Sequence, residues 1–176
     1  MIVKYIEYTY KFKEEPFIEQ IQEGVYLFIR IQPTSSFTKD KTQILSEPYE
    51  VQISFSGNLS PINKIIVNKI SLYDLESKQN IKKQISGVYF SDRKQYLTPS
   101  ELEMFCNNGI FSLENTSNLD HINIDFTNVD IKYLKTKKIK IELGLTIEML
   151  DGSTNYFDRI YMCTRKRSVR YIFPTV

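Results

Sequence analysis

The sequence contains no alanine and no tryptophan, and it has a single histidine, His121. Any Ser–His–Asp triad or Cys–His pair would therefore have to use His121. No nucleophile elbow or glycine-rich oxyanion loop surrounds this residue. The six glycines are spread singly along the chain, and no phosphate-binding glycine motif occurs. These absences argue against nucleophilic catalysis and nucleotide chemistry, so we predict no catalytic residue and no bound cofactor.

Long apolar runs and export signals are missing as well. No stretch approaches the ~20 apolar residues of a membrane-spanning helix. The first residues lack the basic and apolar regions of a signal peptide. We therefore expect a cytoplasmic protein that makes no contact with a membrane. In that compartment the two cysteines, Cys106 and Cys163, are expected to be reduced and buried, and a disulfide between them is the alternative that the spacing leaves open.

Metal ligands are few and poorly spaced. His121, Asn123 and Asp125 alternate along one predicted strand, where neighbours on the same face are about 6.6 Å apart. Side chains at that spacing do not chelate one ion without help from a loop, and no calcium-loop motif occurs. We interpret the three residues as a solvated polar face and predict no metal site. A metal-dependent or hydrolytic enzyme built around His121 is the least favoured functional class.

The length of 176 residues predicts a single domain, 1–176, that can bury a core without a metal or a disulfide. Isoleucine occurs 23 times, whereas alanine, the best helix former, is absent. We interpret this bias as the codon usage of an AT-rich genome. Its structural consequence is a chain that favours strands, because isoleucine is β-branched.

Alternating apolar and polar residues indicate nine or ten strands. The clearest alternation covers residues 49–56 and 138–150, and Asp151–Gly152 supplies the turn of a β-hairpin. A slip in the apolar phase within 63–74 predicts a bulge there. The spacing of the strands predicts an all-β, mainly antiparallel fold, arranged as a two-sheet sandwich, with a β-barrel as the alternative. The pattern resembles immunoglobulin-like sandwiches in general style, although their Cys–Trp–Cys signature is missing.

Three segments interrupt the strand pattern. Pro33 predicts the end of a strand, and the polar residues 34–48 predict a long loop. Thr98 and Glu101 form a capping box that predicts a helix over 99–107, with Gly109 as its stop. A second, weaker helix is predicted over 16–22, where an irregular loop is an equal alternative.

Charge is unevenly distributed although the net charge is only +2. From Gln95 to Ile131 there are six acids and no Lys or Arg, whereas residues 132–176 hold ten bases and four acids. Basic residues beside aromatics suit a nucleic acid, and a solvated surface is the plainest alternative. A third interpretation is that the acidic and basic regions face one another, within the chain or between copies. The candidate partner-binding residues are Arg165, Lys166, Arg167, Arg170, Tyr161 and Tyr171.

Twelve tyrosines and eleven phenylalanines are too many aromatic residues for all the hydroxyls to be buried and hydrogen-bonded. Some tyrosines must therefore be exposed, and tyrosine is enriched at interfaces. We expect a non-enzymatic interaction or assembly module that binds another protein, or a second copy of itself, through a sheet face or edge. A nucleic-acid-binding accessory protein that uses the basic C-terminal region is the alternative.

Overall fold

Most of the chain runs in strands that hydrogen-bond into one sheet. The computed structural model describes residues 3–13, 18–90, 95–97, 100, 102–103, 106–107, 110–114 and 116–173. The elements are β1 (Val3–Phe12), β2 (Ile18–Gln22), β3 (Val25–Lys39), β4 (Thr42–Gly57), β5 (Ile62–Asp74), β6 (Gln79–Asn80), β7 (Gln84–Phe90), β8 (Gln95–Tyr96), β9 (Cys106–Asn107), β10 (Ile110–Glu114), the 3-10 turn η1 (Thr116–Asn118), β11 (His121–Val129), β12 (Lys138–Met149) and β13 (Thr154–Ile172).

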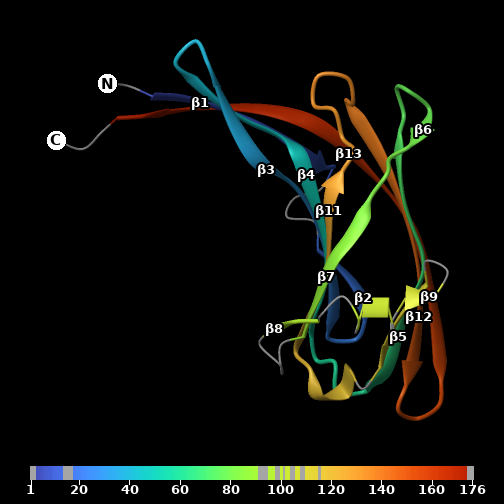
Figure 1. Cartoon of the computed structure of the whole chain (residues 1–176). Coiled ribbons are helices and arrows are strands. Elements are labelled where there is room, and N and C mark those ends of the chain that lie inside the picture. The colour runs from blue at the N-terminus through green and yellow to red at the C-terminus, as the bar shows by residue number, and fades with distance from the viewer. Residues whose placement is uncertain are drawn as a thin grey trace.

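The 13 strands follow the order β8-β7-β11-β4-β1-β13-β12-β5-β10-β9, with β3 between β4 and β2, and with β6 against β5. The pairing of β1 with β4 is parallel, and the other pairings are antiparallel. The predicted all-β, mainly antiparallel class is therefore confirmed. The sheet folds over so that β3, β4, β11 and β7 face β5, β12 and the first half of β13 (Figure 1). The choice between a two-sheet sandwich and a barrel stays a prediction.

The core lies between these two halves of the sheet. In β4 the alternation predicted from the sequence is confirmed, because Tyr49, Val51, Ile53 and Phe55 are all fully buried. The partner layer contributes alternating residues of β12, from Ile139 to Ile147. We call this double-layered part of the molecule the body.

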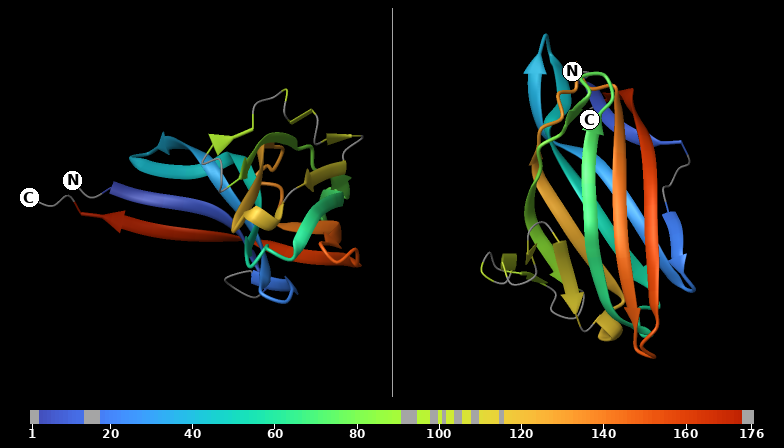
Figure 2. Two further views of the ribbon diagram at one scale, coloured as in Figure 1. Left: turned by 90° about the horizontal axis from the view of Figure 1, so that it is seen from below. Right: turned by 90° about the vertical axis from the view of Figure 1, so that its right-hand side faces the viewer.

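A second part of the sheet leaves the body as a single layer, which we call the arm. It consists of residues 35–39 of β3, 42–46 of β4, 3–9 of β1 and 164–172 of β13, followed by Phe173. Figure 1 shows these strands projecting together to one side, and the left view of Figure 2 shows the same extension from below. Both ends of the described chain lie on the arm.

The arm corrects the predicted loop over 34–48. β3 passes Pro33 and continues to Lys39, and β4 begins at Thr42. The pairing of β3 with β4 shifts register between Pro33 and Ser35. Proline is tolerated at such an irregularity, because no ladder hydrogen bond is required from its nitrogen there. Asp40 and Lys41 form a two-residue turn with positive φ values of 49° and 59°. Such a turn matches the twist of a hairpin.

The two predicted helices also differ from the structure. Ile18–Gln22 is strand β2, because it pairs with β3 through the turn at Gly24, so tertiary pairing overrides the helical spacing. Residues 14–17 lie outside the described part. In the segment 99–107, Ser100, Leu102 and Glu103 are helical, Cys106–Asn107 is strand β9, and the remainder lies outside the described residues.

A buried carboxylate anchors the loop of residues 130–137 to the body. Asp74 accepts hydrogen bonds from the backbone N–H groups of Glu76 (2.9 Å) and Ser77 (3.4 Å) and from the Thr136 hydroxyl (3.0 Å). Burial raises the pKa of Asp74, but these hydrogen bonds outweigh it and leave the pKa below its ordinary value. Thr136 in turn accepts a 2.7 Å hydrogen bond at its carbonyl oxygen from the Tyr10 hydroxyl. The loop is therefore joined to both β5 and β1.

The substitution Asp74→Asn removes the charge and keeps the shape. We expect the free energy of unfolding at neutral pH to fall by about 1–3 kcal/mol, because an amide oxygen accepts these hydrogen bonds more weakly. The lowered pKa stabilises the folded state above the unfolded pKa of about 4, and this contribution is lost as the pH falls through the folded value. Urea unfolding should show a variant–wild-type difference that is constant above about pH 5 and shrinks below about pH 4. A difference that does not change with pH would contradict this role.

The thiol of Cys163 is free and buried where β13 passes from the body into the arm. Burial raises its pKa to about 12, although its contact with the Ile139 carbonyl acts in the opposite direction. A thiol in this environment is a poor nucleophile. It behaves as a small apolar core residue.

In a Cys106→Ser background we expect Cys163 to resist a thiol-reactive dye in the folded protein and to react at once in denaturant. The reason is that the thiolate is both buried and disfavoured by its raised pKa. The measurement is the rate of dye release with and without urea. Equal rates in the two conditions would show that Cys163 is not held in the core.

Candidate interaction surface

The inner face of the arm is the side that continues the core-facing side of the sheet. Phe37 pairs with Ile44, Ile44 with Ile6, and Ile6 with Val169. Residues in register on neighbouring strands point to the same face of a sheet. An apolar row therefore crosses all four strands of the arm, and it is made of residues far apart in the sequence.

Tyr133 covers only the body end of this inner face. Its ring lies 4.7 Å from the Tyr8 ring and 6.5 Å from the Phe37 ring, measured between centroids. The loop that carries it is held by Thr136, through the Tyr10 hydroxyl and the Asp74 carboxylate. The inner face thus has a fixed boundary where its covering layer stops.

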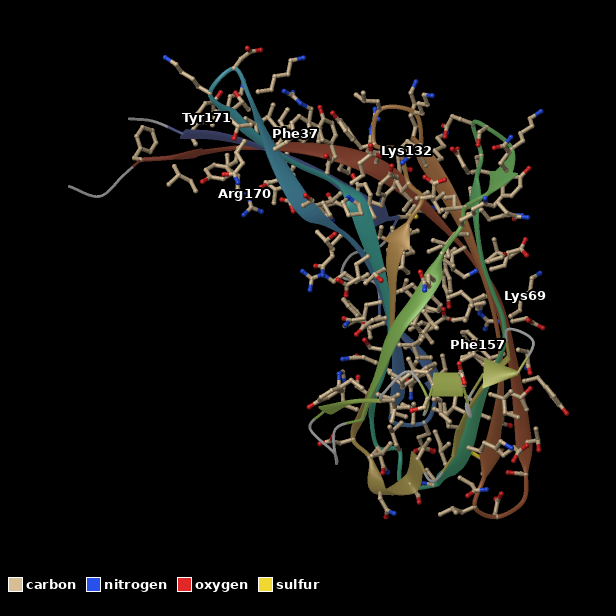
Figure 3. All side chains as sticks on the ribbon, in the orientation of Figure 1. Phe37, Lys69, Lys132, Phe157, Arg170 and Tyr171 are labelled. Carbon is tan, nitrogen blue, oxygen red and sulfur yellow. The ribbon has the colours of Figure 1, made fainter. Side chains whose placement is uncertain are left out.

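Beyond Tyr133 the apolar side chains become exposed toward the tip. Within the apolar row, the central Ile6 is 8% exposed, whereas Val169 and Phe37 at its two ends are 37% and 43% exposed. Tyr171, near the tip, is 57% exposed and Phe173 is 67% exposed. Figure 3 shows Phe37 and Tyr171 on the projecting strands, well away from Phe157 in the body. Exposed apolar side chains gathered on one face are a feature of interaction sites.

The structure brings five of the six predicted partner-binding residues to the arm. Arg165 and Arg167 share the inner face with Tyr171, because all three alternate with the same phase as the buried Cys163. Lys166 and Arg170 lie on the opposite face. Their positions are shown by the pairing of β13 with β1.

Two of these arginines contact β1. The Arg165 guanidinium lies 5.7 Å from the centre of the Tyr8 ring, a cation–π contact. Arg170 lies 3.6 Å from the Glu7 carboxylate in an exposed ion pair, which contributes little to stability. Both contacts leave most of the positive charge of the arm facing solvent.

Tyr161, the sixth predicted residue, lies in the body rather than on the arm. It is buried, its hydroxyl donates a 2.7 Å hydrogen bond to Glu19 of β2, and its ring meets the edge of Phe12. Burial, together with the neighbouring Glu19 carboxylate, raises the pKa of Tyr161. This tyrosine therefore joins β13 to β2, beside the Arg159–Glu19 ion pair that links the same two strands.

The arm is strongly basic compared with the rest of the chain. Within its described strands and turn it carries two acids, Glu7 and Asp40, and seven bases. The bases are Lys4, Lys39, Lys41, Arg165, Lys166, Arg167 and Arg170. With a net charge of +2 for the whole chain, the part outside the arm is net negative. The molecule is therefore polarised in charge.

The β13 edge of the arm is less suited to docking than its inner face. β12 pairs with β13 only as far as Thr164, so among the described residues the later part of β13 pairs on one side alone. That edge carries four bases between Arg165 and Arg170. Charged side chains on an exposed edge discourage the addition of another strand. The inner face is the better candidate for contact.

His121 begins β11, and its ring lies 6.5 Å from the Tyr89 ring. The predicted solvated face of His121, Asn123 and Asp125 is wrong for Asp125, which is buried and accepts a 2.8 Å hydrogen bond from Gln52. The cause is that β11 lies between β4 and β7, so neighbouring side chains cover it. No group of three or more His, Cys, Asp or Glu side chains in the described ranges could hold a metal ion.

The apolar row could not be found by scanning the sequence for basic or aromatic clusters. Phe37 and Ile44 fall in the segment predicted as a loop, and Ile6 lies in a strand with aromatics on both faces. A local signal was present, since Phe37 and Ile44 lie the same number of residues before and after a two-residue turn, as the paired residues of a hairpin do. Recognising it required the pairing of β4 with β1, which joins residues 38 positions apart, such as Ile6 and Ile44.

No family model and no curated protein matches this chain. Among solved structures, one similar chain comes from a structure described as the complete structure of manganese lipoxygenase of Gaeumannomyces graminis and the partial structure of zonadhesin of Komagataella pastoris. The similarity covers 98% of this chain and 86% of that chain, with 9% sequence identity and a TM-score of 0.40. A similarity at this level carries no argument about fold or function.

Over the described residues, none of the helical segments has the length and apolarity that crossing a membrane would require.

The two tyrosines of the predicted set should behave differently. Tyr161→Phe removes the hydrogen bond to Glu19 in a buried seam, so we expect a loss of about 1–2 kcal/mol in the free energy of unfolding. Tyr171→Ser affects an exposed side chain, and a change within about 0.5 kcal/mol is expected. Urea denaturation of both variants measures this. A larger loss for Tyr171→Ser than for Tyr161→Phe would mean that Tyr171 supports the fold.

Proposed function

We propose that this protein is a non-enzymatic interaction or assembly module that binds a protein partner through the inner face of its arm. The observation that supports this proposal most directly is the apolar row of Phe37, Ile44, Ile6 and Val169. It continues the core-facing side of the sheet onto the arm; its Phe37 end touches Tyr133, and its two outer members, Phe37 and Val169, are exposed. A sheet with an apolar face is stabilised when another layer covers that face. A partner can supply this layer.

The composition of the arm supports a protein contact. Its inner face combines aliphatic side chains with Tyr171, Arg165 and Arg167 at the border. Interfaces are enriched in aromatic residues and arginine, and their centres are apolar. The three aliphatic members of the row, Ile44, Ile6 and Val169, favour another protein, because the bases of a nucleic acid stack on aromatic rings rather than on isoleucine and valine. We also infer a reducing compartment such as the cytoplasm, which is supported by the free thiol of Cys163.

A capture experiment with matched variants tests the proposal. The immobilised full chain is exposed to a lysate of the source organism as wild type, as an arm triple variant and as a control. The arm variant is Phe37→Ser, Val169→Ser and Tyr171→Ser. The control is Tyr156→Ser, Ile160→Ser and Met162→Ser, which removes exposed apolar residues from the outer side of β13 in the body.

We expect one protein, or more of this chain itself, to be retained in stoichiometric amount by the wild type and the control. The arm variant should retain at least about tenfold less, which corresponds to losing ~1.4 kcal/mol of binding free energy. Far-UV circular dichroism and melting curves check that all three forms are folded. Retention that is equal in the arm variant, or no retained protein at all, would overturn the proposal.

Nucleic-acid binding is a second candidate because Arg165, Tyr8 and Arg167 lie together on the inner face beside Tyr171. Basic side chains and aromatic rings on one face suit a single strand of nucleic acid. The test is fluorescence titration of a labelled oligonucleotide over a range of salt concentrations. Binding that weakens with salt, and weakens further in Arg165→Gln and Arg167→Gln, would favour this candidate. An unchanged signal at low salt would end it.

A further inference from the structure

The end of the body remote from the arm is built from four loops. These are residues 22–24, 57–61, 116–120 and 150–153. Three backbone hydrogen bonds join them: Asn58 N–H to Gly24 O (2.9 Å), Gly57 N–H to Asp120 O (3.1 Å) and Leu150 N–H to Pro61 O (2.9 Å). In Figure 1 these loops lie at the bottom of the body, whereas the arm leaves from the top.

This remote end is acidic. Its four loops contain Glu23, Asp120 and Asp151, all exposed, and no Lys or Arg. We call it the acidic end. It contrasts with the arm, where seven bases accompany two acids. One molecule therefore carries surfaces of opposite charge at its two ends.

The acidic end also has a recess of about 360 Å³. It is lined by Gly57, Asn58, Leu59, Ser60, Ser117, Asn118, Leu119 and Asp120. Gly57 has a φ of 109°, and a Cβ at this position would lie 2.1 Å from the Gly24 carbonyl oxygen. Only glycine fits there, because the loops at residues 24 and 57 approach each other closely beside the recess. Beside them Leu150 is exposed at the turn between β12 and β13.

From these two surfaces we propose that the partner of the arm is the acidic end of a second copy of this chain, so that the protein associates head to tail. This inference rests on the proposed function, because it uses the arm as the binding surface. The charges of the arm would face Glu23, Asp120 and Asp151, and an aromatic side chain of the arm would enter the recess. Complementary charge steers association and fixes orientation.

Charge also argues against a symmetric arm-to-arm dimer. Stacking two inner faces would place Arg165, Arg167 and Lys39 of one copy against the same bases of the other. Like charges held close together in an interface oppose association. A contact between two different surfaces of identical copies is heterologous, and it produces rings or open chains rather than closed dimers.

The experiment measures self-association of the purified full chain by sedimentation velocity. We expect the mean mass to rise with concentration at about 50 mM salt and the apparent Kd to increase at least about tenfold at about 500 mM salt, because exposed charges are screened. A monomer at every concentration, or an oligomer indifferent to salt, would overturn the head-to-tail contact. Capture of a different protein by the arm would still support the proposed function, so the two failures are distinguishable.

Two charge-reversal variants make the test specific. The arm variant is Lys4→Glu, Lys39→Glu and Arg167→Glu, which leaves the arm with four bases and five acids, and the end variant is Glu23→Lys with Asp151→Lys. Each alone should remain monomeric, because its arm and its end then carry the same sign of charge. A mixture of the two should associate again, since both kinds of contact in the mixture join opposite charges.

The matched control is Lys78→Glu with Lys82→Glu, which reverses two exposed lysines outside both surfaces. It should associate as the wild type does, with an apparent Kd within about threefold. Failure of the mixture to associate, or loss of association in the control, would overturn the inference. Melting curves of each variant, read beside the sedimentation data, show that a monomer is a folded monomer.

Discussion

The backbone ladder of β13 is the interaction on which the rest of the structure depends. Residues 154–164 pair with β12 in the body, and residues 163–172 pair with β1 in the arm. The two ladders overlap at Cys163 and Thr164. Because the register is constant through both, the face that is buried at Phe157, Tyr161 and Cys163 continues on the arm at Arg165, Arg167 and Val169. One face of the arm is therefore continuous with the core-facing side of the body, although no second layer of strands among the described residues packs against the arm.

The loop of residues 130–137 decides where the covered sheet ends. It is tied to β5 by the Thr136–Asp74 hydrogen bond and to β1 by the hydroxyl of Tyr10. These ties place Tyr133 against Tyr8, at the base of the arm. A buried polar network thus positions an aromatic side chain at the border of the candidate interface. The anchoring groups lie in the body, so the border does not depend on whether the arm is occupied.

The strands that bury alternate residues were predictable, and the arm was not. Residues 49–56 and 138–150 alternate because one side faces the core, and Gly152 adopts the positive φ of the predicted hairpin turn. The bulge expected within 63–74 is confirmed, since the register of β5 shifts between Val67 and Lys69. Residues 34–48 form strands that bury little, so their polar sequence carries no periodic signal. Pairing with β4 and β1 shapes them instead, and such pairing is not local.

The candidate site was predictable only in its charged part. Arg165, Lys166, Arg167, Arg170 and Tyr171 are consecutive enough to stand out in the sequence, and the structure places them on the arm. Tyr161 was grouped with them by proximity along the chain, but a single strand crosses from core to arm between Met162 and Thr164. The apolar row was missed because its four members come from four strands. Neither a local sequence pattern nor the composition predicts which residues of four separate strands come into register.

The course of β13 has a mechanical consequence. The strand starts beside the turn at Asp151–Gly152, at one end of the molecule, and it finishes at Ile172 near the tip of the arm. A pulling force between these two ends would act along the strand. Hydrogen bonds in an antiparallel ladder lie across the strands, so such a force is carried by the covalent backbone of β13 and not by the hydrogen bonds to β12 and β1. One continuous strand thus joins the two ends of the molecule, and tension between them passes through a single covalent chain.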